Sequence, residues 1–164
     1  MLANPYVLTL LDFIHQMASI AWIGGMVFNL LAVLPAVQQS LDPSLAGKFI
    51  GALMKRVRVI AYSSLLALFI TGIPLKIASE YYGGIINFDT TWSTASFVKH
   101  VLVAILALVA FYSFERLSPK VAKVAQAGPS EELLQLRNRQ KKLAGLSFLL
   151  GLSIVLISVY MKYL

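Results

Sequence analysis

The chain has 164 residues, of which 59% are hydrophobic and only 13% are charged, and its formal net charge is +7. So few charged side chains could not cover a soluble domain of this length, which excludes an ordinary soluble protein and makes the lipid bilayer its expected partner. The absence of cysteine excludes disulfides, thiolate metal sites, iron–sulfur clusters and covalently attached haem.

Four long apolar segments follow one another, and each is close to the ~20 residues that a helix needs to cross a bilayer. We place the spans at residues 6–37, 57–78, 92–116 and 141–162. The third apolar run is short, so we expect its helix to begin near Trp92, with Lys99 reaching towards the interface. The prediction is a single domain, residues 1–164, folded as an all-α integral membrane protein with a four-transmembrane-helix up-down bundle.

Capping and helix-breaking residues mark the three connections. Asp42-Pro43 is typical of a helix start, and Gly83-Gly84 breaks the chain between the second and third spans. Gly128-Pro129-Ser130-Glu131-Glu132 ends one helix and starts the next, with acids at the new N-terminus. We therefore expect helices that extend beyond the bilayer, to about 30 residues each at ~1.5 Å per residue.

Basic residues are concentrated in two of the connections. Residues 38–58 hold four and residues 116–142 hold seven of the 14 lysines and arginines. By the positive-inside rule these two connections face the cytoplasm, whereas the second connection and both termini face outward. The expected location is the plasma (inner) membrane of a prokaryote. Because the rule also accounts for the net positive charge, nucleic acid is not an expected partner.

The only two histidines, His15 and His100, both fall in predicted spans, where ionisable side chains are rare and usually mark a site. His15 follows Asp12, the last outer charge of the first span, and His100 follows Lys99, the last outer charge of the third. Both imidazoles are therefore expected in the outer third of the bilayer, on helices that are diagonal partners in an up-down bundle. Two histidines facing each other across the bundle would suit a b-type haem.

Small and polar residues accompany each histidine at helical spacing, and the small ones leave room for a flat macrocycle. Trp22 and Met26 could equally serve only in helix packing. Lys99 could pair with a haem propionate or anchor its helix at the membrane interface. Without a cofactor, each histidine would be an interhelical hydrogen-bond partner. The candidate metal ligands are His15 and His100, and the candidate cofactor contacts are Ser19, Trp22 and Met26 on the first span with Lys99 and Ala104 on the third.

The first span reads His15-Gln-Met-Ala-Ser-Ile-Ala-Trp22-Ile-Gly24-Gly25. A histidine in the first span, a tryptophan seven residues later and then glycines resemble the copper-resistance D (CopD-like) membrane proteins. The same spacing is similar to that of the HemJ-type protoporphyrinogen oxidases. Thr71-Gly72 and Lys99 are further matches.

The two resemblances imply different chemistry. The first implies copper handling across the inner membrane. The second implies haem binding and oxidation of protoporphyrinogen, with His15 as the shared ligand and Lys99 as the shared basic residue. His100 is not part of the HemJ-type pattern, and Ile-Gly-Gly follows the tryptophan here where that pattern has Ala-Gly-Leu.

Three functions stay open at this point. The first is a protein with haem b (iron), a haem-dependent oxidoreductase or electron carrier that exchanges electrons with a redox partner or quinone near the outer face. The second is copper transport, although below Met26 the only soft ligand is Met54 in the first cytoplasmic connection. The third is an accessory subunit without a cofactor. No catalytic residue is assigned, and a homodimer stays open.

Overall fold

The computed structural model describes residues 4–84 and 86–164, excluding the side chains of residues 43 and 44, and it confirms the all-α fold. Within this part of the chain, four helices are long and apolar enough to cross a membrane: Pro5–Ser40, Leu45–Ile77, Thr91–Gln126 and Glu131–Tyr163. They have 33 to 36 residues each, in agreement with helices that continue past their apolar segments. The chain is therefore a membrane protein with a four-helix bundle.

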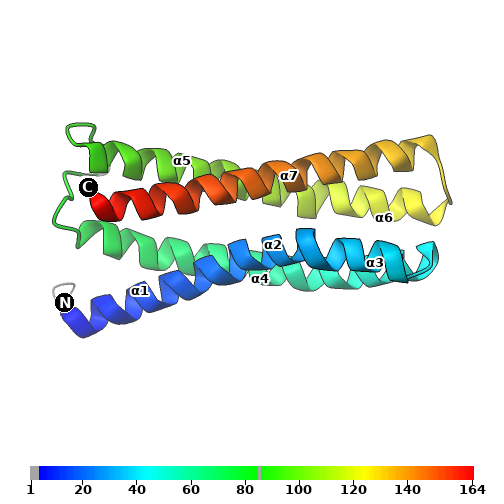
Figure 1. Ribbon diagram of the computed structural model, residues 1–164, viewed down its shortest axis with the longest axis horizontal. Helices are drawn as coiled ribbons and strands as arrows, with labels where there is room; N and C mark the ends of the chain where they lie inside the picture. The colour runs from blue at the N-terminus through cyan, green and yellow to red at the C-terminus, as the bar shows by residue number, and fades with distance from the viewer. Residues whose placement is uncertain (1–3, 85) are drawn as a thin grey trace.

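Each long helix is made of one or more consecutive segments (Figure 1). The first contains α1 (Pro5–Ser19), η1 (Ile20–Gly24), α2 (Gly25–Phe28), η2 (Asn29–Val33) and α3 (Leu34–Ser40). The second is α4 (Pro43–Ile77), and the third contains α5 (Thr91–Tyr112), η3 (Ser113–Leu117) and α6 (Ser118–Gln126). The fourth contains α7 (Glu131–Tyr160) and the 3₁₀ turn η4 (Met161–Tyr163), whereas η1, η2 and η3 are π-helical turns.

Capping side chains fix where the third and fourth helices begin. The Thr90 side chain accepts a hydrogen bond from the Ser93 N–H at 3.1 Å, so the third helix starts beside Trp92 as expected. Ser130 caps α7 in the same way. Asp42 occupies the N-cap position of α4, but its side chain makes no capping bond. The starts of α5 and α7 are therefore fixed by a side-chain hydrogen bond, whereas the start of α4 is not.

Two of the three π-helical turns precede a proline. Pro35 follows η2 and Pro119 follows η3, each two residues after the turn ends. A proline in a helix lacks the N–H that would bond the carbonyl four residues earlier, and a widened turn relieves the local mismatch. The turn η1 has no such proline and ends at the glycine pair Gly24-Gly25.

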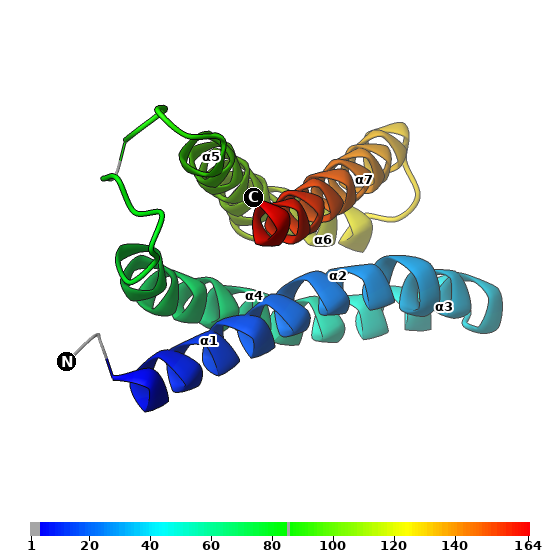
Figure 2. The same cartoon turned by 60° about the vertical axis from the view of Figure 1, so that its left-hand side comes forward.

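The four helices form two antiparallel hairpins, α1–α4 and α5–α7, which lie against each other (Figure 2). Both termini lie at one end of the bundle, and the α3–α4 and α6–α7 connections lie at the other (Figure 1). One buried residue from each helix meets in the core: Trp22, Ala61, Leu106 and Ile154. The core therefore joins the two hairpins near the middle of the bundle, whereas α1 diverges from the other helices towards its N-terminus (Figure 1).

Candidate metal centre

His15 of α1 is half-buried and faces α4, where its ring contacts Thr71 and Gly72. Its Nδ1 lies 2.8 Å from the hydroxyl oxygen of Thr71, which is only 3% exposed. The next residue is Gly72, and a Cβ atom built there would lie 3.2 Å from His15 Cε1. The glycine therefore leaves the space that the imidazole occupies, and the threonine fixes its orientation.

The hydrogen-bond directions define which ring nitrogen of His15 carries the proton. The Thr71 hydroxyl donates its only proton to the carbonyl oxygen of Ala67 at 2.7 Å. Towards His15 it can therefore only accept, so Nδ1 is the donor. In the neutral imidazole this leaves an unprotonated lone pair on Nε2, which is the form in which histidine binds a metal.

His100 of α5 is held in the same tautomer by its own helix. Its Nδ1 lies 2.6 Å from the carbonyl oxygen of Ser96, which can only accept a hydrogen bond. Its Nε2 therefore also presents a lone pair. His100 is exposed in the isolated chain. It lies one turn after Ser96, which is buried on α5 together with Leu106.

Charged and polar groups place the two histidines in one neighbourhood. His15 lies within electrostatic range of both Lys99 and His100, on the third helix. Lys99 is half-buried and takes part in neither of the ion pairs among the described residues, which are Arg58–Glu115 and Lys120–Glu132. An ammonium group thus lies within electrostatic range of both imidazoles.

The other candidate contacts do not all lie beside the histidines. Ser19 donates its hydroxyl proton to the His15 carbonyl at 2.9 Å, so its side chain bonds its own helix. Trp22 is 7% exposed and belongs to the central core, so it is more buried than the half-buried His15. Met26 packs over Gly151 of α7, and Ala104 is exposed on α5. Their roles in binding a cofactor stay predictions, with Trp22 and Met26 occupied in helix packing.

The number of available ligands restricts the metal chemistry. No group of three or more histidines or carboxylates suited to a metal ion occurs in residues 4–84 and 86–164. A bare transition-metal ion in a protein usually takes three or four protein ligands. A haem iron already has four porphyrin nitrogens and needs one or two axial ligands, which two neutral histidines can supply.

The sequence analysis did not identify a second polar cluster, which lies nearer the α3–α4 and α6–α7 connections. The Tyr62 hydroxyl donates to Glu115 Oε1 at 2.8 Å, and Arg58 Nη1 lies 3.5 Å from the same oxygen. The Tyr62 ring also meets Phe114 edge to face, with 5.9 Å between centroids. Arg58 begins the apolar run of the second span and Glu115 ends that of the third, and these bounding charges were the signal for this contact between α4 and η3.

Comparison with protein-family models, with curated proteins and with solved structures finds no match for this chain. The geometry of the described residues is therefore the basis for the functional argument.

Proposed function

We propose that the protein is a membrane-embedded b-type haem protein, with His15 and His100 as the axial ligands. The observation that carries the proposal is the hydrogen bonding of the two imidazoles. Each ring donates through Nδ1, to Thr71 in one case and to the Ser96 carbonyl in the other, which leaves Nε2 able to ligate iron. A haem iron with two histidine ligands supports one-electron transfer.

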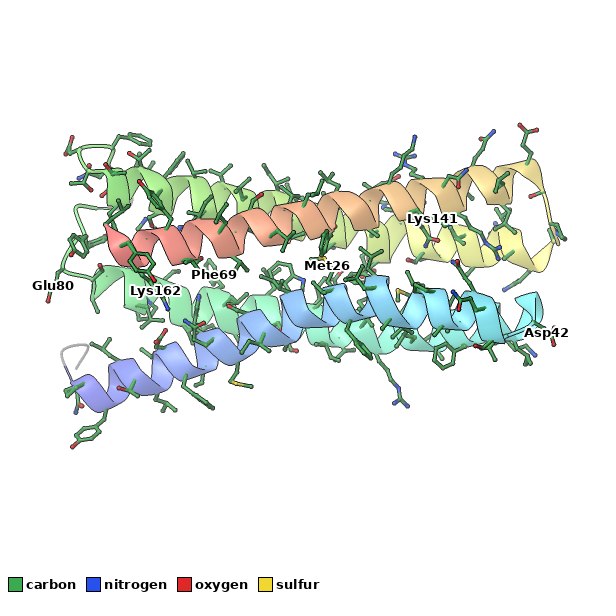
Figure 3. The ribbon with its side chains drawn as sticks, viewed as in Figure 1. Met26, Asp42, Phe69, Glu80, Lys141 and Lys162 are labelled. Atoms are coloured by element: carbon green, nitrogen blue, oxygen red, sulfur yellow. The ribbon has the colours of Figure 1, made fainter. Side chains whose placement is uncertain are left out.

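Apolar and cationic side chains near the histidines suit the two parts of a haem. Phe69 (labelled in Figure 3) is 67% exposed and Ile73 is 47% exposed on α4. They lie two and three turns after Tyr62, on the side of α4 that faces the third helix. Such side chains can cover an apolar macrocycle. Lys99 supplies a positive charge that can pair with a haem propionate, the anionic group of the cofactor.

The distribution of basic residues favours a haem near the outer face. The connections rich in lysine and arginine belong in the cytoplasm of a prokaryote in this proposal. The histidines belong to α1 and to the first half of α5, segments on the side of the bundle that carries both termini (Figure 1). A haem there would exchange electrons with a redox partner outside the plasma membrane or with a membrane quinone. The protein acts in this proposal as an electron carrier.

An optical spectrum of the detergent-purified protein, oxidised and then reduced with dithionite, tests the proposal. We expect a Soret band and sharp reduced α and β bands in the wild type, and loss or shift of these bands in both His15→Ala and His100→Ala. A band that depends on His15 alone would contradict bis-histidine ligation and indicate a single axial histidine.

A protein that shows no Soret band when haem is supplied during expression would overturn the haem proposal. Titration with Cu(I) under reducing conditions then separates the two remaining functions. Binding that His15→Ala abolishes would favour copper handling, whereas no binding would favour an accessory subunit without a cofactor.

A further inference from the structure

A groove of about 350 Å³ lies between α1 and α4 at the end of the bundle that carries the termini. Leu8, Thr9 and Asp12 line it from α1, and Leu75, Ala78 and Ser79 line it from α4. These residues precede His15 and follow Thr71 at helical spacing, so the groove lies directly outside the His15–Thr71 hydrogen bond on the same helix–helix seam.

The lining combines apolar side chains from both helices with several hydrogen-bond acceptors, and it includes no basic residue. The Thr9 hydroxyl already donates to the Pro5 carbonyl at 2.9 Å, so towards the groove it can only accept. The Ser79 oxygen accepts from the Tyr81 N–H at 3.4 Å. Asp12 Oδ1 is 3.4 Å from Gln16 Nε2, which leaves most of the capacity of the exposed carboxylate unused.

This chemistry selects the ligand. An anion would be repelled by Asp12, and a metal ion would find one carboxylate and no further acidic or imidazole ligand in the lining. A neutral, flat ligand with hydroxyl donors matches both the acceptors and the apolar side chains of the lining. The volume is at the lower end of the ~300–1,000 Å³ typical of small-molecule sites, which suits a single aromatic headgroup whose tail stays in lipid.

We propose that the groove binds the hydroquinone headgroup of a membrane quinol and that the Asp12 carboxylate accepts its hydroxyl protons. Binding stands independently of the haem, whereas the electron-transfer step rests on the function proposed above.

Oxidation breaks both O–H bonds of the quinol and gives the quinone, two protons and two electrons. Asp12 takes each proton in turn and releases it to water at the outer face. A haem held by His15 and His100 would supply one-electron chemistry, so the two electrons would leave one at a time to an outer one-electron acceptor. His15 is one turn from Asp12 on the same helix, so the proton acceptor and the proposed iron ligand are adjacent.

Calorimetric titration of the protein in nanodiscs with decylubiquinol, under argon and with empty nanodiscs subtracted, tests the binding. Asp12→Asn keeps the size of the side chain and removes its charge, so we expect affinity to fall about tenfold or more. Ala78→Phe fills the groove and should abolish binding. Asp89→Asn is the matched control, because Asp89 is also exposed at this end and does not line the groove.

Decylubiquinone, which lacks the hydroxyl donors, provides the chemical control. We expect it to bind the wild type more weakly than the quinol and to be insensitive to Asp12→Asn. Quinol affinity that is unchanged in both groove variants, with helical circular dichroism intact, would overturn the proposal.

The two proposals fail separately. Spectra of the same preparations report haem, so groove-dependent quinol binding without a Soret band would contradict only the haem proposal. A haem-loaded protein whose quinol affinity is the same in the wild type, in Asp12→Asn and in Ala78→Phe would contradict only the quinol site.

Discussion

At the scale of single residues, the orientation of His15 depends on one buried hydroxyl. Thr71 is 3% exposed and forms two hydrogen bonds, one to Ala67 of its own helix and one with the imidazole. Groups that hold the second nitrogen of a metal-binding histidine usually matter nearly as much as the ligand itself. Thr71 is therefore a positioning residue that sets the tautomer and the ring direction of His15.

Replacing Thr71→Val keeps the shape of the side chain and removes the acceptor for the Nδ1 proton. We expect the affinity for haem to fall about 10- to 100-fold, the usual cost of losing such a partner. Titration of the haem-free protein with haem, followed at the Soret band, measures it. The expected spectrum at saturation is shifted, since the ring is free to rotate.

Thr94→Val provides the matched control for this change. The Thr94 hydroxyl bonds the Thr90 carbonyl of its own helix at 3.1 Å, is exposed and contacts neither histidine. Its affinity for haem should equal that of the wild type. If Thr71→Val also binds haem like the wild type, Thr71 does not position the ligand.

Residue types alone predicted the two histidines as candidates but not their hydrogen bonds. His15 and Thr71 are 56 positions apart, so their contact depends on the register of two antiparallel helices, which hydropathy does not define. Thr71 and Gly72 entered the sequence analysis only through a family resemblance. The tautomer of His15 requires the second bond of Thr71, which a sequence does not reveal.

At the scale of helices, the third span is joined to the second by a polar contact at a π-helical turn. The turn η3 carries Glu115, whose side chain is 34% exposed and accepts the Tyr62 hydroxyl proton. At 3.5 Å, Arg58 makes a longer contact of modest strength with the same oxygen. The Tyr62–Glu115 bond is therefore the main polar link between the two hairpins on this side of the core.

Tyr62→Phe removes the hydroxyl and keeps the ring packed against Phe114. We expect a loss of about 1.5 kcal/mol in the free energy of unfolding, because a bond to a charged acceptor in a partly exposed site is removed. Unfolding in mixed micelles with increasing SDS measures the change. Tyr6→Phe, at a position that is 85% exposed, should leave stability unchanged, and an equal stability of both variants would refute the role of the link.

The helices themselves were largely predictable from the sequence, whereas their interruptions were not. Apolar run length gave four spans, and the Thr90 and Ser130 caps start helices where the sequence indicated. The π-helical turns were not anticipated, since prolines such as Pro35 are equally consistent with a simple kink. They rotate the residues that follow them, which limits face assignments made by constant helical spacing.

At the scale of the whole molecule, the two ends of the bundle differ in charge and in chemistry. The half of the bundle with the termini contains α1, the start of α5 and the groove, and therefore both histidines. The opposite end carries the connections rich in lysine and arginine. Glu80 and Lys162 mark the first end, and Asp42 marks the second, with Lys141 on that side of the centre (Figure 3). The functional proposals require the first end to face outward, so that protons and electrons leave to the outside.

This orientation is testable with single cysteines, because the natural chain has none and each introduced thiol is unique. We expect a membrane-impermeant maleimide to label Glu80→Cys and Lys162→Cys on intact cells, and to label Asp42→Cys and Lys141→Cys only after permeabilisation. The wild type provides the unlabelled control. The opposite pattern would place the histidines on the cytoplasmic side and contradict an outer redox site, whereas labelling of all four in intact cells would contradict a membrane-spanning bundle.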